Sequence, residues 1–62
     1  MNNIKSVREQ RGLSLREVSK LTGISFSYLW QLESGKAQNP REGTKIMISK
    51  GLKSTLNEVF PE

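Results

Sequence analysis

The sequence predicts an all-α fold, a compact bundle of five helices within one domain that spans residues 1–62. Three observations support this class. Apolar residues recur at helical spacing and do not alternate as they would along half-buried strands. Serine and threonine caps and glycine turns divide the chain into short segments, with no repeat, low-complexity tract or linker between them. The chain has no cysteine and no histidine, so helix packing, or a partner, must stabilise it without disulfides or the usual zinc sites.

The first helix is expected from about Asn3 to Arg11, with Ile4, Val7 and the stem of Arg8 facing inward. These inward positions are three and four residues apart, so they lie on one face of a helix. The helix is expected to stop at Gly12, because glycine readily adopts the left-handed conformation found just beyond helix ends.

The start of the second helix has the strongest local signature in the chain. Ser14 as the N-cap, with Glu17 three residues later, forms a capping box, and Leu13 with Val18 fits the flanking hydrophobic staple. Val18 and Leu21 are then expected to face the core. The second helix is therefore fixed at its first residue and turns an apolar face inward.

A third helix is expected almost immediately after the second. Gly23 permits the positive φ of a sharp turn, and Ser25 can cap a helix over Phe26–Ser34 that ends at Gly35. Only this one glycine turn separates the two helices, so they must cross steeply instead of lying side by side. This is the helix-turn-helix arrangement, with a core at about residues 14–34. In this arrangement one face of the later helix of the pair, here the third helix of the chain, is available to a major groove.

The outward face of this third helix is the candidate functional surface. Leu29 and Leu32 point to the core, which places Ser27, Gln31 and Ser34 on the opposite side, with Phe26 and Trp30 along one flank. A glutamine amide can bond adenine bidentately and an apolar group can contact a thymine methyl, whereas no acidic residue lies on this face. The edges of DNA bases are the best match.

A fourth helix is expected from roughly Glu42 to Lys53, with Ile48 and Leu52 inward. Its start is open, because Asn39 before the Pro40 turn resembles a cap and Thr44 is an alternative.

The fifth helix is expected to begin near Thr55, which forms a second possible capping box with Glu58. It should end at Phe60, because a residue that precedes proline disfavours the helical conformation. The helix is short, so its stability must come from packing on the others.

Composition favours a nucleic-acid partner over the other classes. Ten Lys and Arg residues against six Asp and Glu give a net charge of +4 and a pI near 9.9, the footprint of a nucleic-acid-binding module. No segment has the length of a membrane span or the pattern of a signal peptide, so a cytoplasmic protein is expected. An enzyme is disfavoured because His and Cys are absent, most Ser residues sit at caps, and no Gly-rich phosphate loop or metal-ligand spacing occurs.

At this point a resemblance becomes clear. The stretch VREQRGLSLREVSKLTGISFSYLWQLESGK resembles the Cro and phage-repressor (XRE-like) family of helix-turn-helix regulators, and the match extends over the NP loop to the ending STLNEVF. The resemblance implies a lambda-repressor-like fold and a transcriptional regulator, as a rule a repressor, that binds operators in double-stranded DNA, usually as a homodimer. It also implies a bacterial or phage-encoded protein that is nucleoid-associated when bound. No cofactor, metal or small-molecule ligand is expected, since the residues offer no metal-ligand spacing and no Gly-rich phosphate loop.

The resemblance assigns roles to individual positions. Base-reading positions fall on Phe26, Ser27 and Gln31, and phosphate-contacting positions on Ser14, Lys36 and Arg41; an Arg to Glu ion pair maps onto Arg8 and Glu33. From its place on the other flank of the third helix, Tyr28 is expected to have a half-buried ring and a hydroxyl within reach of a phosphate.

Two departures from the family pattern affect these assignments. Leu15 stands where many relatives have a phosphate-contacting Gln, and Gly51 and Lys53 stand where they usually have Ala and then Gly, close to the usual dimer surface.

Several alternatives stay open on sequence alone. Gln31 can be a solvated surface residue, and Phe26 can pack at the core edge instead of entering a groove. Trp30 is expected to pack on the fourth helix, with the DNA backbone or another protein as the other candidates for its contact. A competing function is a protein-interaction module, an antitoxin or an adaptor, that uses Trp30 and Phe26 as anchors on the same scaffold.

Overall fold

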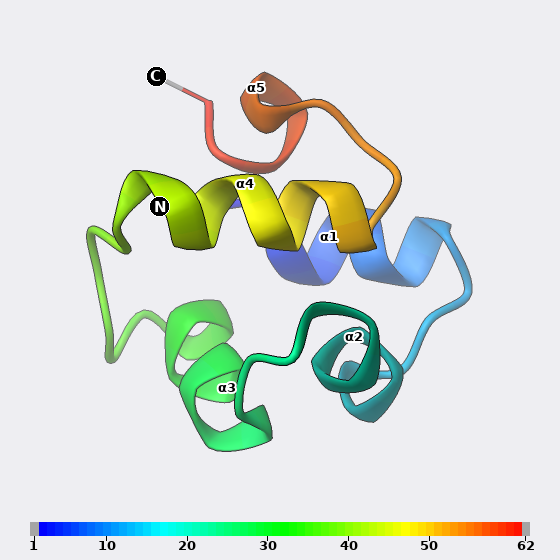
Figure 1. Cartoon of the computed structure of the whole chain (residues 1–62), viewed down its shortest axis with the longest axis horizontal. Coiled ribbons are helices and arrows are strands. Elements are labelled where there is room, and N and C mark those ends of the chain that lie inside the picture. The colour runs from blue at the N-terminus through cyan, green and yellow to red at the C-terminus, as the bar shows by residue number, and fades with distance from the viewer. Residues whose placement is uncertain (1, 62) are drawn as a thin grey trace.

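Residues 2–61 are described by a computed structural model, and within this range all regular structure is helical. The helices are α1 (Ile4–Gln10), α2 (Leu15–Thr22), α3 (Phe26–Ser34), α4 (Glu42–Gly51) and α5 (Leu56–Val59). In Figure 1, α4 crosses the middle of the molecule with α1 behind it, α5 lies above, and α2 and α3 lie below. The predicted all-α class and five-helix architecture are confirmed. None of the helices between residues 2 and 61 has the length and apolarity that crossing a membrane requires.

The core takes at least one apolar side chain from every helix. The seven apolar residues predicted to face inward from α1, α3, α4 and the start of α2 are buried: Ile4, Val7, Val18, Leu29, Leu32, Ile48 and Leu52. Val59 and Phe60 at the end of α5 complete the cluster. The backbone N–H of Asn3 donates to the carbonyl of Val59 at 2.8 Å, so the beginning of α1 is attached to the end of α5.

Three predicted N-caps are confirmed. Ser14 Oγ accepts from the backbone N–H of Glu17 at 3.1 Å, while the Glu17 carboxylate accepts from the backbone N–H of Ser14 at 2.8 Å. Thr55 and Glu58 form the same reciprocal pair at 3.2 and 2.8 Å, and Ser25 caps α3. Such caps satisfy N–H groups that have no partner within a helix, so they fix where each helix begins.

Both capping boxes contain a carboxylate, so we expect stability to fall in acid. Hydrogen bonds from the backbone N–H groups of Ser14 and Thr55 lower the pKa of Glu17 and of Glu58 below the ordinary 4.5. Because the folded-state pKa values are depressed, this stabilisation is present above about pH 4.5 and is lost as the pH falls through the lowered values. The measurement is the urea midpoint between pH 6 and pH 2.5.

The variant Glu17→Gln with Glu58→Gln is the matched control, since Gln keeps the capping geometry and does not titrate. The difference in midpoint between the wild type and this variant should shrink as the pH falls below about 4.5. Midpoint curves that stay parallel down to pH 2.5 would contradict the assignment.

The prediction that Leu21 faces the core is wrong, because its side chain is 60% exposed. The buried residue of this turn is Thr22, four residues after Val18, whose hydroxyl donates to the Val18 carbonyl at 2.8 Å and accepts from the N–H of Ile24 at 3.2 Å. Gly51 of α4 lies directly against Thr22, so α4 approaches α2 on the Thr22 side. Leu21, one residue away around the helix, is therefore left at the edge.

Gly51→Ala should destabilise the protein by about 1–3 kcal/mol through overpacking, although alanine favours helix. A Cβ at Gly51 would lie 2.5 Å from Cγ2 of Thr22, and this methyl cannot turn away without breaking both hydrogen bonds of the Thr22 hydroxyl. Thermal or urea unfolding measures the loss. In a Thr22→Ser background, which removes the methyl and keeps the hydroxyl, Gly51→Ala should be neutral or stabilising; an equal loss in both backgrounds would refute this explanation.

The bounds of α1 and α4 differ from the prediction. The first helix covers Ile4–Gln10 and is one residue shorter at each end. In α4 neither Asn39 nor Thr44 is the cap, because Arg41 occupies the N-cap position and makes no side-chain capping bond. The helix ends at Gly51, and Lys53 has a φ of +53°.

The early end of α4 goes with the left-handed φ of Lys53, across which the Ser54 N–H donates to the Ser49 carbonyl at 3.0 Å. The side chain of Arg11 supports this end. Its Nε donates to the Leu52 carbonyl at 3.1 Å, and its Nη2 donates to the Lys53 carbonyl at 3.3 Å and to Ser54 Oγ at 2.9 Å. These bonds supply partners for carbonyls at a helix end that would otherwise lack them. The guanidinium of Arg11, the residue just after α1, therefore bonds the segment that follows α4.

Candidate nucleic-acid interface

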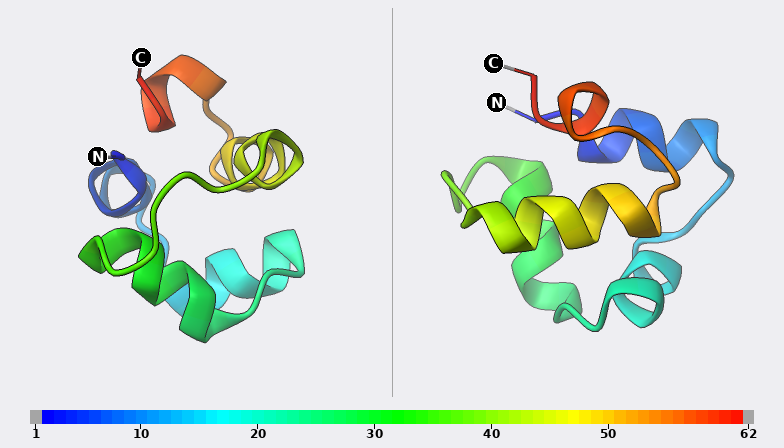
Figure 2. Two further views of the ribbon diagram at one scale, coloured as in Figure 1. Left: turned by 90° about the vertical axis from the view of Figure 1, so that its left-hand side faces the viewer. Right: turned by 45° about the horizontal axis from the view of Figure 1, so that its top comes forward.

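The turn between α2 and α3 is short and internally bonded. Gly23 has a φ of +74°, and its N–H donates to the Ser19 carbonyl at 2.8 Å. The Ser19 hydroxyl in turn donates to the carbonyl of Ile24 at 2.6 Å. Figure 2 shows that α2 and α3 run in different directions and together form the side of the molecule opposite α5. The predicted crossing of two helices at a glycine turn is therefore present.

The outer face of α3 is exposed to solvent. We use this name for the residues Phe26, Ser27, Trp30, Gln31 and Ser34, all of them exposed. Leu29 and Leu32, on the opposite side of the helix, are fully buried. The side-chain amide of Gln31 and the hydroxyl of Ser27 make no hydrogen bond with any residue from 2 to 61. Donor and acceptor groups on this face are thus available to a partner.

A basic side chain lies over each of the two aromatic rings of this face. The guanidinium carbon of Arg16 lies 4.8 Å from the centroid of the Phe26 ring, and the ammonium of Lys36 lies 4.9 Å from that of the Trp30 ring. The two rings are 40% and 45% exposed and lie outside the buried core cluster. Sequence reasoning missed both contacts, because each joins residues from different segments of the fold.

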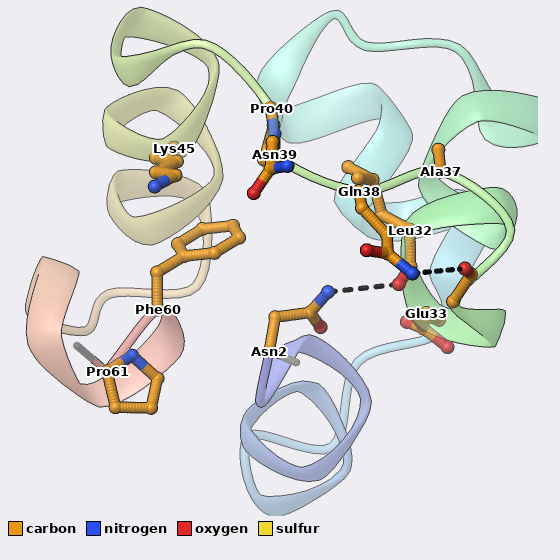
Figure 3. A pocket seen from close by; sticks show the side chains of 11 residues that line it. Asn2, Leu32, Glu33, Ala37, Gln38, Asn39, Pro40, Lys45, Phe60 and Pro61 are labelled. Carbon is orange, nitrogen blue, oxygen red and sulfur yellow. Dashed lines mark hydrogen bonds between the residues drawn. The ribbon is translucent and has the colours of Figure 1, made fainter.

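The loop after α3 presents two cations and is held from behind. Lys36 and Arg41 are exposed. The N–H of Ala37 donates to the Gln31 carbonyl at 3.0 Å. Figure 3 shows two further bonds, from the amide of Asn2 to the Leu32 carbonyl at 2.9 Å and from the amide of Gln38 to the Gly35 carbonyl at 3.4 Å.

A pocket of about 340 Å³ lies behind this loop. The loop forms one wall, and Asn2, Lys45 and Phe60 form the other. The Lys45 ammonium lies 5.7 Å from the centroid of the Phe60 ring on the same wall, so the lining combines polar and apolar side chains. No three His, Cys, Asp or Glu side chains gather in the described part of the chain as a metal site would require.

The Arg8 and Glu33 side chains form a bidentate ion pair. Arg8 Nε lies 2.8 Å from Glu33 Oε2 and its Nη2 lies 3.1 Å from Oε1, while Nη1 donates to the Leu13 carbonyl at 3.0 Å. Side-chain exposures are only 14% and 8%, and the hydrogen bond to Glu33 raises the pKa of Arg8. The pair joins α1 to the end of α3 and to the entry of α2, so it positions the two crossing helices.

The two remaining predicted positions lie at the edges of this surface. Ser14 is exposed, but both its N–H and its Oγ are bonded to Glu17. The Tyr28 ring is partly buried against the core, as expected from its flank position, and its hydroxyl has no hydrogen-bond partner between residues 2 and 61. Leu15 stands where many relatives have a phosphate-contacting Gln, and its side chain packs against the core cluster.

A comparison with protein families gives one match over most of the chain. The helix-turn-helix family matches residues 4–59, a range that contains the whole of α1 to α5. No curated protein matches the chain.

Proposed function

The chain belongs to the helix-turn-helix family of DNA-binding regulators, and on this premise we propose that it is a sequence-specific regulator of transcription that acts as a repressor. In this proposal α3 enters the major groove of double-stranded DNA. Phe26, Ser27 and Gln31 contact base edges there. The domain that performs this task spans residues 1–62.

The observation that carries the proposal is the exposed outer face of α3. Gln31 offers both a donor and an acceptor from one amide, the arrangement that pairs with the N6 and N7 atoms of adenine. Ser27 adds a hydroxyl, and the Phe26 ring can contact a thymine methyl. No carboxylate lies on this face, so it would bring no negative charge against the phosphates.

Phosphate contacts in this proposal come from the surroundings of α3. Lys36 and Arg41 are basic side chains that emerge from the loop that follows α3, where the DNA backbone passes the reading helix. Ser14 and Tyr28 add hydroxyl groups that can donate to phosphate oxygens. These contacts set the orientation of the protein on the duplex and are independent of its sequence.

We further propose that the protein binds as a homodimer on an operator with two related half-sites. Their centres would then lie about 34 Å apart, one turn of the double helix.

Selection of binding sites from randomised duplex DNA tests the function. We expect enrichment of one short motif, with two-fold symmetry if the protein binds as a dimer. Binding to the selected duplex should weaken about tenfold per subunit when salt is raised fourfold, because neutralising two phosphates gives a slope near −1.8. Recovery of no motif together with affinity that ignores salt would refute the proposal, and it is the result that an antitoxin or adaptor would give.

A further inference from the structure

The arginines of this protein divide into two pairs by what their side chains do. Arg8 and Arg11 use their donors within the fold, on Glu33 and on the end of α4. Arg16 and Arg41 are exposed and make no hydrogen bond or ion pair with residues 2–61. Arg41 is already part of the proposed interface, whereas Arg16 has no role in it. Its five N–H donors are therefore without an assigned partner.

The N–H donors of Arg16 are unused, but its guanidinium lies against an aromatic ring. Its guanidinium carbon lies 4.8 Å from the centroid of Phe26, the first residue of α3. A guanidinium can rest its planar face on an aromatic ring while its N–H edges stay available for an anion. The ring thus holds the cation at the start of the reading helix without consuming the groups that bind phosphate.

The position of Phe26 relative to Trp30 extends this argument. The two rings are four residues apart on one helix, so they lie on the same flank of α3 and about 6 Å apart along its axis. Each carries a cation, Arg16 on one and Lys36 on the other. Both cations therefore lie against rings on one flank of α3, a placement that suits contact with the backbone of a DNA strand beside the reading helix.

The charge at the start of α2 supplies a second reason for a cation there. A helix N-terminus usually attracts phosphate through its free N–H groups. Here the carboxylate of Glu17 accepts from the N–H of Ser14 at 2.8 Å, so an anion already lies at this helix start. A positive charge in this turn would offset the carboxylate, and Arg16 lies in the same first turn of α2 as Glu17.

We propose that Arg16 contacts the DNA backbone beside the start of α3, and that Phe26 is the residue that positions it. This inference rests on the proposed function and adds to it a phosphate contact that the family pattern does not assign to this chain. Phe26 then has two tasks, contact with a base and support of the guanidinium. Arg16 is a binding residue. In supporting the guanidinium, Phe26 is a positioning residue that acts on phosphate binding only through Arg16.

The test compares charge-matched variants on the duplex recovered by selection. Arg16→Gln removes one positive charge from the first turn of α2, and Lys20→Gln removes one from the last turn of the same helix. The slope of log K against log salt should become less steep by about 0.9 for Arg16→Gln and should not change for Lys20→Gln. Circular dichroism checks that both variants fold.

The positioning role has its own readouts. Without DNA, the side-chain protons of Arg16 should resonate upfield because of the Phe26 ring, and Phe26→Leu should abolish this shift. On DNA, Phe26→Leu should weaken the wild type more than it weakens Arg16→Gln, by about two- to fivefold for an exposed stack. Equal effects of Phe26→Leu in both backgrounds would overturn the positioning role.

The outcomes separate this inference from the proposed function. If the wild type selects a motif and binds it in a salt-dependent way while Arg16→Gln keeps the wild-type slope, only the Arg16 contact is refuted. If the wild type selects no motif and ignores salt, the proposed function and this inference fail together. A slope reduced equally by Arg16→Gln and Lys20→Gln would show a general charge effect and would also refute the contact.

Discussion

Glu33→Ala is expected to lower the free energy of unfolding by about 3 kcal/mol, the lower end of the range for breaking a buried ion pair. The variant leaves the Arg8 guanidinium with the Leu13 carbonyl as its remaining partner, in a place where the Arg8 side chain is only 14% exposed. A domain of 62 residues has about 3–9 kcal/mol of stability in total. The expected loss is therefore between about a third and all of this stability. Urea denaturation at neutral pH should find the midpoint clearly lowered.

Two controls decide whether the pair is the cause. Glu9→Ala removes an exposed carboxylate from α1 and should change stability by less than about 0.5 kcal/mol. Arg8→Met with Glu33→Leu replaces both charges by apolar groups and should recover most of the loss, because no charge is left unpaired. A loss below about 1 kcal/mol for Glu33→Ala would mean that the pair behaves like a surface salt bridge.

Features of the fold that depend on neighbouring residues could be predicted from the sequence. Ser14 with Glu17 and Thr55 with Glu58 are three residues apart, so each capping box is complete within one helical turn. The glycine turn at Gly23 is likewise local. Helical spacing also identified most of the core, because one face of each helix must be buried whatever the neighbouring helix is.

Features that depend on how helices meet could not be predicted in this way. Leu21 is the more hydrophobic residue of its turn, yet Thr22 is buried because Gly51 of α4 approaches there. The bond from Arg11 to the end of α4 joins residues 41 positions apart. The stacking of Arg16 on Phe26 likewise requires the crossing angle of α2 and α3, which sequence spacing bounds only roughly.

In the candidate site, too, some features could be predicted from helical spacing and others could not. Exposure of the outer face of α3 follows from the burial of Leu29 and Leu32 on the other side, and so it could be predicted from helical periodicity. The base and phosphate roles of individual side chains came from resemblance to the family, and they stay predictions. Experiments can separate these roles, because loss of a base contact changes sequence preference whereas loss of a phosphate contact does not.

Gln31→Ala is expected to reduce affinity for the preferred duplex by about 1–3 kcal/mol and to relax preference at one base position. The amide of Gln31 has no hydrogen bond within residues 2–61, so its removal changes no contact that holds α3. Affinities for the selected duplex and for all single base-pair variants of it give the measurement. Gln10→Ala is the matched control, since it removes the same side chain from the exposed end of α1 and should leave base preference unchanged.

Lys36→Ala provides the contrast that gives the Gln31 result its meaning. An ammonium that contacts phosphate is indifferent to the base pair beside it, so this variant should weaken all duplexes nearly equally and lower the salt slope by about 1. Gln31→Ala should do the reverse, changing preference at one position and leaving the slope intact. If both variants weakened every duplex by the same factor, the assignment of base reading to Gln31 would fail, and base reading by α3 would have to come from Phe26 and Ser27.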